Sequence, residues 1–304
     1  MTIKVKILIL GISGMLGHAV FKHFYGRSNY STYGTVRSNN TLKPFFNVDE
    51  QQYIISGVDA ENFDSFLTVF EVVQPDVVIN CIGIIKHLPE SKDYFKSINI
   101  NSFLPHRLAK LCSIASARLI HISTDCVFDG KTGNYKESDN ANADDLYGKS
   151  KFLGEVDYQH AITIRTSIIG HELNSNISLI DWFLCQQKSV NGYTNAIYSG
   201  FPTYEIANII EGYIIPNKSL HGLYHVSSDP INKYDLLKLV ASIYHKKIQI
   251  VPYSGFVLNR ALDSSKFREI TQFKPKVWLD LIEEMHSIYS NYTCYKNKYS
   301  LIGK

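Results

Sequence analysis

The sequence predicts an α/β protein in which a doubly wound parallel sheet is followed by a smaller α/β lobe. Two observations predict the sheet. Several short strands are apolar on both faces, and they alternate along the chain with segments of helical periodicity. A third observation is the length of 304 residues, which suffices for one large domain with an added lobe. Such alternation favours parallel strands joined by right-handed crossovers.

In the first half of the chain, strands and helices follow one another regularly. Apolar runs predict strands at 5–10, 32–36, 77–81, 119–123 and 162–165. Helical periodicity predicts helices at 14–25, 62–73, 93–115 and 146–159. The second helix ends before Pro75, because the residue preceding a proline avoids the helical conformation, and the third is interrupted near Pro105.

The second half is less regular, and we expect it to supply most of the smaller lobe. Helices are predicted at 177–187, 204–215, 233–244 and 277–289, and strands at 222–226 and 248–251. Residues 190–201 are rich in Gly, Asn and Tyr, which predicts a loop and a short strand. We therefore expect a first domain over 1–170, to which segments around 190–220 return, a lobe mainly from 171–290, and a polar tail over 291–304.

Composition excludes several classes of function. Hydrophobic residues make up 45% of the chain and charged residues 19%. The net charge is only +3 and the sequence has no dense block of basic residues, so nucleic acid is not an expected partner. The five cysteines form no Cys-x-x-Cys pair, which favours free thiols in a reducing cytoplasm. No signal peptide or membrane span is recognisable, and the scattered histidines predict no metal site.

A glycine-rich segment joins the first strand to the first helix. It reads Gly11-Ile12-Ser13-Gly14-Met15-Leu16-Gly17. Glycines at this point allow a tight turn and a close approach of backbone N–H groups to a pyrophosphate, which the helix N-terminus also attracts. The spacing departs from the standard G-x-G-x-x-G fingerprint. We interpret the segment as a dinucleotide-binding turn, the alternative being a turn without a ligand.

Residues after the next strands indicate which dinucleotide binds. Arg37 and Ser38 follow the second strand, where an acidic residue would read a ribose 2′-hydroxyl and an arginine accommodates a 2′-phosphate. We therefore favour NADP(H) over NAD(H), although a solvated arginine would look the same. Further cofactor contacts are predicted at the ends of the third strand-like stretch and of the strand at 77–81: Asp59, Ala60, Cys81, Ile82 and Gly83. For Asp59, capping of the helix from 62 is an equal alternative.

Three side chains predict carbonyl–alcohol redox chemistry. Tyr147 and Lys151 are four residues apart and share one helix face. The ammonium of Lys151 is expected to lower the pKa of Tyr147, which suits a proton donor. Thr124 ends the strand before this helix and offers a hydroxyl to a substrate carbonyl, although a strand-end threonine also caps turns. Tyr-x-x-x-Lys recurs twice elsewhere in the chain. The copy at Tyr147 is the functional candidate because it follows a strand that ends in Ser-Thr-Asp.

Taken together, these motifs resemble the extended short-chain dehydrogenase/reductase family. Within it the chain is similar to the dTDP-4-dehydrorhamnose reductase-like branch over roughly residues 3–285. The motifs that carry the resemblance are Gly11-x-x-Gly14-x-x-Gly17, Ser123-Thr124-Asp125-Cys126-Val127-Phe128-Asp129-Gly130, Tyr147-x-x-x-Lys151, Leu153-Gly154-Glu155, Arg165-Thr166-Ser167, Phe201-Pro202-Thr203, Leu223-Tyr224-His225-Val226 and Arg260-Ala261-Leu262-Asp263-Ser264.

The resemblance implies a Rossmann-type NADP-binding domain over 1–170 and a nucleotide-sugar-binding lobe over 171–290. It implies reduction of a 4-keto group on a nucleotide-linked 6-deoxyhexose, dTDP- or UDP-linked, for bacterial surface polysaccharide. The implied catalytic residues are Thr124, Tyr147 and Lys151, and the last two also contact the cofactor together with the active-site helix residue Asn101. The implied substrate contacts are Lys86, Thr124, Asp125, Cys126 and Arg260, although Arg260 could equally be a surface residue. A homodimer would form through the helices beginning near 93 and 146.

One departure from the branch leaves alternatives open. The branch usually has Tyr where this chain has Cys126, and the carboxylate of dehydratase relatives is also missing there. The GDP-fucose synthase branch places a Cys at this spacing and uses it with a His, so Cys126 and His171 could support a combined epimerase and reductase. Cys126 could equally be a small buried side chain, and His171 a loop residue. A regulator that binds NADP without turnover is the third alternative.

Overall fold

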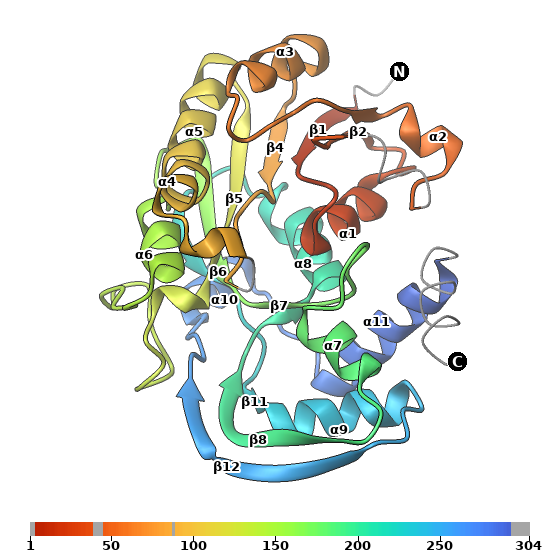
Figure 1. Ribbon diagram of the computed structural model, residues 1–304. Helices are drawn as coiled ribbons and strands as arrows, with labels where there is room; N and C mark the ends of the chain where they lie inside the picture. The colour runs from red at the N-terminus through yellow and green to blue at the C-terminus, as the bar shows by residue number, and fades with distance from the viewer. Residues whose placement is uncertain (1–3, 39–44, 87–88, 293–304) are drawn as a thin grey trace.

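The computed structural model describes residues 4–38, 45–86 and 89–292. Its larger part is a seven-stranded parallel sheet with the order β10-β6-β5-β4-β1-β2-β3 (Figure 1). The strands are β1 (Val5–Leu10), β2 (Tyr30–Thr35), β3 (Ile54–Ile55), β4 (Val77–Asn80), β5 (Arg118–Thr124), β6 (Ala161–Thr166) and β10 (Gly222–His225). The order reverses beside β1, so the glycine-rich turn after β1 lies at the switch point where such sheets bind ligands.

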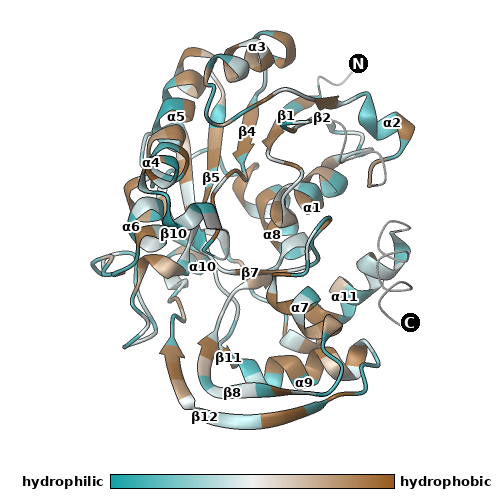
Figure 2. Ribbon diagram, in the orientation of Figure 1, coloured by the Kyte–Doolittle hydropathy of each residue, from teal (hydrophilic) through white to brown (hydrophobic). Residues whose placement is uncertain are grey.

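Helices cover both faces of this sheet. One face carries α1 (Met15–Phe24) and α8 (Thr203–Ile209), and the other carries α3 (Asp64–Val73), α5 (Leu104–Ile114) and α6 (Leu146–Leu153). Side chains of β1 alternate between the two cores, because successive residues of a strand point to opposite faces. Both faces are buried, and Figure 2 shows β1 and β4 coloured as hydrophobic.

The smaller lobe is built around a three-stranded sheet of order β11-β8-β12. Its strands are β8 (Ser189–Tyr198), β11 (Ile231–Asn232) and β12 (Gln249–Asn259), and its helices are α7 (Leu179–Cys185) and α9 (Lys233–Ile243). In Figure 1, β8 and β12 lie at the bottom of the view, below α9. The remaining elements are α2 (Val48–Gln51), the strand pair β7 (Ile168–Ile169) and β9 (Phe201–Pro202), α10 (Ser265–Thr271) and α11 (Trp278–Asn291).

The predicted strands of the first half are confirmed, but two helices end or break differently. The helix predicted over 146–159 ends at Leu153, with Gly154 as its C-cap. The helix predicted over 93–115 consists of α4 (Tyr94–Ser97), a π-helix (Ile98–Phe103) and α5. The interruption therefore precedes Pro105, which lies at the start of α5 where its missing N–H is harmless.

The lobe departs further from the sequence predictions. Residues 190–201, expected as loop and short strand, contain most of the ten-residue strand β8, and the strand expected at 248–251 extends to Asn259. Pairing of β8 with β12 and β11 outweighs its unfavourable composition. β8 belongs to the small sheet, whereas α8 and β10 pack with the large one. The predicted boundary at 170 stays a prediction.

The predicted tail from 293 onward and Cys294 lie outside the described residues. Within the described part of the chain, Cys81, Cys112 and Cys126 are free thiols. No helix of the described ranges is long and apolar enough to cross a lipid bilayer.

Candidate active site

Thr124, Asp125 and Tyr147 meet at the carboxyl end of β5. Thr124 ends the strand, and its Oγ1 accepts a hydrogen bond from Cys126 N (3.1 Å) while donating to Asp125 Oδ1 (3.2 Å). Tyr147 lies in the first turn of α6, where its side chain hydrogen-bonds Thr124. Asp145 fixes the start of this helix by accepting from Gly148 N (2.8 Å). The threonine and tyrosine predicted to flank a substrate carbonyl therefore lie side by side.

The pKa of Tyr147 is raised above its ordinary value, mainly because burial disfavours the phenolate, and the charge of Cys126 acts in the same direction. The hydrogen bond from Thr124 opposes this effect without outweighing it. The expected decrease of the Tyr147 pKa is therefore wrong in direction for this structure. A phenol with a raised pKa is fully protonated at neutral pH, so it holds the proton that reduction of a carbonyl requires.

Lys151 lies one turn after Tyr147 and is buried. Its Nζ donates to the carbonyl oxygen of Ile122 on β5 (2.7 Å). On its other side is the end of β4, since a Cβ added to Gly83 would lie 3.9 Å from the same Nζ. Burial lowers the pKa of Lys151 to about 8. The ammonium therefore lies between the ends of β4 and β5, where the sequence predicted contacts with the cofactor.

We expect turnover to fall as the pH rises through about 8, because the Lys151 ammonium then loses its proton. Unfolding does not explain this loss of turnover. The pKa of Lys151 is about 8 in the folded state and near 10.5 in the unfolded state. Between these two pH values the folded state binds fewer protons, so its stability increases as the pH rises. A kcat profile from pH 6.5 to 9.5 measures the effect. Lys149→Gln, an exposed position on the same helix, should leave the profile unchanged. A rate that stays constant up to pH 9.5 would contradict the assignment.

The glycine-rich turn has the geometry that a pyrophosphate requires. Gly11 has a positive φ of 83°, which L side chains rarely adopt. A Cβ at Gly17 would overlap the carbonyl oxygen of Gly11, so only glycine lets α1 pack this closely on the turn. Gly14 is the N-cap of α1 and provides no side chain to cap the first-turn N–H groups. These groups, with Ser13, Met15 and Leu16 around them, fit an anionic ligand.

Asn101 ties the predicted cofactor loop to the catalytic helix. It is buried in the π-helix, and its Oδ1 accepts from Ile84 N (2.8 Å). Its Nδ2 donates to Ile84 O (3.1 Å) and to Ser150 Oγ on α6 (3.2 Å). Cys81, Ile82 and Gly83 occupy the segment that this side chain holds. π-Helical turns often occur at functional sites, and here the turn aims an amide between two segments of the candidate site.

The residues predicted at the adenosine end lie along the edge of β2. Arg37 and Ser38 are exposed just beyond this strand. The carbonyl oxygen of Arg37 accepts from Gly57 N (3.2 Å), which brings the segment with Asp59 and Ala60 beside it. The Asp59 carboxylate accepts from Glu61 N (3.1 Å), so it shapes a local turn, whereas α3 begins only at Asp64. The exposed side chain of Arg37 can meet a ligand at this end of β2.

Two of the predicted substrate contacts have well-defined partners. Arg260 follows β12 and reaches across to the turn after β5, where its Nε donates to Phe128 O (2.8 Å) and its Nη1 lies 3.5 Å from Cys126 Sγ. Lys86 forms an exposed ion pair with Asp145 (2.7 Å), the N-cap of α6. The small lobe and the sheet therefore meet at the end of β5.

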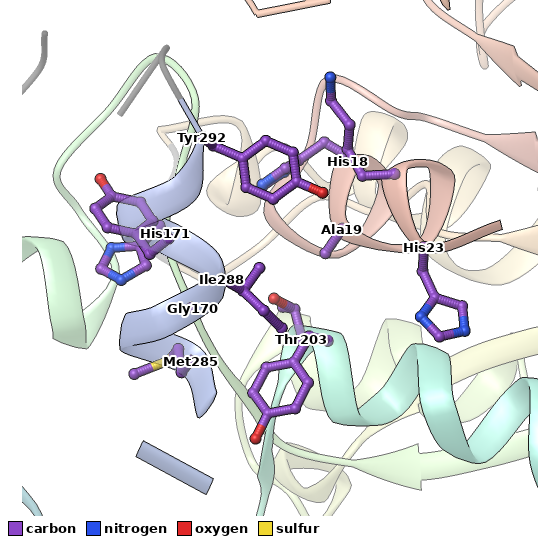
Figure 3. Close-up of a pocket in the computed structure, with 12 residues that line it drawn as sticks. His18, Ala19, His23, Gly170, His171, Thr203, Met285, Ile288 and Tyr292 are labelled. Atoms are coloured by element: carbon purple, nitrogen blue, oxygen red, sulfur yellow. The ribbon is translucent and has the colours of Figure 1, made fainter. Parts of the chain in front are cut away.

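The two residues of the epimerase alternative belong to different hydrogen-bond networks. Burial raises the pKa of Cys126 to about 12, which keeps the thiol protonated. The ring nitrogens of His171 lie 2.7 Å from Asp181 Oδ1 and 2.8 Å from Tyr244 Oη. His171 lines a cavity of about 140 Å³ between α1, α8 and α11, which His18 also lines (Figure 3). Neither residue is arranged here as an acid–base pair.

Sequence reasoning missed a buried ion pair beneath the turn. Arg165 on β6 donates from Nε and Nη2 to the two carboxylate oxygens of Glu155, both at 2.7 Å. Glu155 also accepts from Ser123 Oγ (2.8 Å), next to Thr124, and the Arg165 guanidinium lies 5.1 Å from the centre of the Phe128 ring. An arginine inside an apolar strand signals a buried partner, and Glu155 is one of two acids shortly before it in the sequence, with Asp157.

Comparison with known proteins finds relatives that match most of the chain. The family model described as RmlD substrate binding domain matches residues 5–290. The methionine adenosyltransferase 2 subunit beta of Mus musculus is 32% identical over 316 aligned residues, covering 92% of this chain and 89% of that protein. A dTDP-4-dehydrorhamnose reductase of Aggregatibacter actinomycetemcomitans is 24% identical over 299 residues, covering 90% and 95%.

Solved structures share the fold. The dTDP-4-dehydrorhamnose reductase of Bacillus anthracis, solved in complex with NADP, superposes with a TM-score of 0.77 at 20% identity, covering 94% of this chain and 99% of that one. Among the residues described here, no group of three or more His, Cys, Asp or Glu side chains could hold a metal ion.

Proposed function

Because the chain belongs to the RmlD substrate binding domain family, as a dTDP-4-dehydrorhamnose reductase-like extended short-chain dehydrogenase/reductase, we propose that it reduces a nucleotide-sugar carbonyl with a nicotinamide cofactor. The substrate is a dTDP- or UDP-linked 4-keto-6-deoxyhexose, a precursor of bacterial surface polysaccharide. The observation that carries the proposal is the meeting of Thr124, Tyr147 and Lys151 beside a glycine-rich turn fit for a pyrophosphate.

Each of these side chains has a defined task in the proposed reaction. A bound nicotinamide cofactor would supply the hydride that reduces C4 of the sugar. Tyr147 Oη gives its proton to the carbonyl oxygen, and Thr124 Oγ1 holds that oxygen in place. Lys151, fixed on the Ile122 carbonyl, binds the ribose and stabilises the phenolate that the proton transfer leaves behind. Asp125 and Arg260 surround the hydroxyl pair on the side of the small lobe.

NADP(H) is the cofactor we favour, because Arg37 is exposed at the end of β2 and the chain has no acid there. Arg37→Glu should weaken NADPH binding by roughly 10-fold or more, since it replaces a charge-assisted hydrogen bond by repulsion, and should leave NADH binding near its original value. Titration of both cofactors by fluorescence measures the two dissociation constants. Equal effects on NADPH and NADH would contradict the role of Arg37.

A substrate panel tests the reaction itself. NADPH oxidation is followed with enzymatically prepared 4-keto-6-deoxy forms of dTDP-, UDP- and GDP-sugars, in D₂O and with product analysis. A simple reductase incorporates no deuterium at C3 or C5 beyond the control without enzyme. Enzyme-dependent deuterium at these carbons would instead support the epimerase and reductase alternative with Cys126 and His171.

The relatives named as methionine adenosyltransferase 2 subunit beta favour a second candidate function. In this alternative the chain binds NADP as a subunit of a larger assembly and turns nothing over. The paired Tyr147 and Lys151 argue for the enzyme, since a binding subunit has no need of a buried proton donor. NADPH binding without turnover of any sugar in the panel would favour the subunit.

We also propose that the chain forms a homodimer through the helices around α4 and α6. Their outer surfaces expose large apolar side chains, and such a patch marks an interaction site. These side chains are Tyr94, Phe95, Ile98, Phe103, Phe152 and Leu153. Sedimentation of the purified chain at micromolar concentration tests this, and a monomer would contradict it.

A further inference from the structure

Two cationic residues follow the strands that flank β8 in the small sheet. In the hydrogen-bonded order β11-β8-β12, Asn232 and Asn259 both pair with Ile197 of β8. Lys233 follows Asn232 at the start of α9, and Arg260 follows Asn259 at the end of β12. β11 runs antiparallel to β8 and β12 runs parallel to it, so the chain continues in opposite directions after Asn232 and Asn259. Because neighbouring strands are about 5 Å apart, these two last strand residues lie about 10 Å from each other, one on each side of β8.

Lys233 is half-buried, yet its ammonium has no close partner. Within the described ranges its Nζ makes no hydrogen bond and no ion pair. The titratable groups within its electrostatic reach are Asp125 and Cys126 in the turn after β5, and Arg260, which binds that turn. Burial lowers the pKa of Lys233 while Asp125 opposes this effect. An ammonium that is partly removed from water without a partner is suited to an anionic ligand.

Arg260 contributes the second charge and is held rigidly. Its Nε donates to Phe128 O (2.8 Å) and its Nη1 lies 3.5 Å from Cys126 Sγ, while Nη2 makes no hydrogen bond in the described part of the chain. Asp125 is the acid that both cations sense, and one of its carboxylate oxygens already accepts from Thr124. Asp145 also interacts electrostatically with Arg260, but it is already paired with Lys86. Lys233 and Arg260 against Asp125 therefore leave a net positive charge facing the candidate site.

We propose that Lys233 is a substrate-binding residue that, together with Arg260, holds the diphosphate of a nucleoside diphosphate sugar. This inference rests on the proposed function, since that substrate has its anionic group beside the sugar. Arg260 offers a fixed planar donor, and Lys233 a mobile point charge that follows the phosphate. The small lobe would thus supply both cations and the large sheet the reacting groups.

Binding of nucleoside diphosphates tests the role of Lys233 without any turnover. Calorimetry of the full chain with NADP⁺ present compares dTDP, UDP and GDP, and the tightest-binding one is used for the variants. Lys233→Met should weaken its binding about 10-fold or more, because a charge-assisted hydrogen bond is lost. Lys238→Met, an exposed lysine on the same helix, should change the dissociation constant less than twofold. Lys233→Arg should keep most of the affinity.

Two results would overturn the proposal: unchanged diphosphate binding in Lys233→Met, or no binding of any of the three nucleotides to the unmodified chain. Thermal melts of each variant separate loss of binding from loss of folding. The failure of the proposed function looks different. In that case nucleoside diphosphates bind in a manner that depends on Lys233, but no 4-keto sugar is reduced.

Discussion

Tyr147→Phe is expected to lower kcat about 100-fold to about 10,000-fold while leaving NADPH binding within about twofold. The reason is that the phenol is the buried proton donor beside Thr124, and removing a positioned general acid costs a rate factor of about this size. The phenyl ring keeps the packing of the first turn of α6. Single-turnover kinetics with a saturating 4-keto sugar measure the chemical step, and fluorescence titration measures cofactor binding.

Tyr158→Phe is a matched control for this variant, because Tyr158 lies after the same helix and its Oη is 3.3 Å from His106 Nδ1. Its turnover should equal that of the unmodified chain. If Tyr147→Phe kept normal turnover, the proton would come from elsewhere and the assignment of Tyr147 would be wrong. A large loss of NADPH affinity in the same variant would instead place Tyr147 in cofactor binding.

Arg165→Met is expected to lower the free energy of unfolding by about 3–5 kcal/mol. The side chains of Arg165 and Glu155 are 2% and 9% exposed, so removing the cation leaves a buried carboxylate without its counter-charge. Urea unfolding followed by circular dichroism measures the change. Lys86→Met breaks an ion pair whose partners are 44% and 38% exposed, and it should cost at most about 1 kcal/mol.

The double variant Arg165→Met/Glu155→Leu separates the charge from the packing. It should recover much of the lost stability, because an apolar pair of similar volume replaces a buried ion pair at little net cost. The turnover of the double variant should nevertheless be lower than that of the unmodified chain. Ser123 loses the carboxylate that fixes the strand end next to Thr124. An Arg165→Met loss below 1 kcal/mol would show that the pair does not support this part of the sheet.

The first half of the chain could be predicted because local and tertiary signals agree there. β1 is apolar on both faces and is buried on both faces, and the glycines after it occupy a turn that only glycine allows. The positions of Thr124, Tyr147 and Lys151 followed from spacing, since one strand end and one helix face bring them together. The role of each in catalysis stays a prediction until the variants are measured.

The parts that could not be predicted depend on contacts distant in sequence. β8 contains Gly and Asn, which disfavour strands, and it forms because β12 and β11 pair with it. Lys233 looks like an ordinary lysine at a helix start until the fold brings it within electrostatic reach of Asp125 and Arg260. The rise of the Tyr147 pKa is caused mainly by burial, and the spacing between Tyr147 and Lys151 in the sequence does not reveal how deeply the tyrosine is buried.

The measurement that tests the central claim most directly is the fate of the hydride. The chain is incubated with 4-deuterated NADPH and a 4-keto-6-deoxy nucleotide sugar, and the product is examined by NMR. We expect one deuterium at C4 of the sugar, transferred from a single face of the nicotinamide, and none in Tyr147→Phe above the background. Formation of a reduced sugar without deuterium at C4, or NADPH binding with no reduction of any sugar tested, would contradict the account.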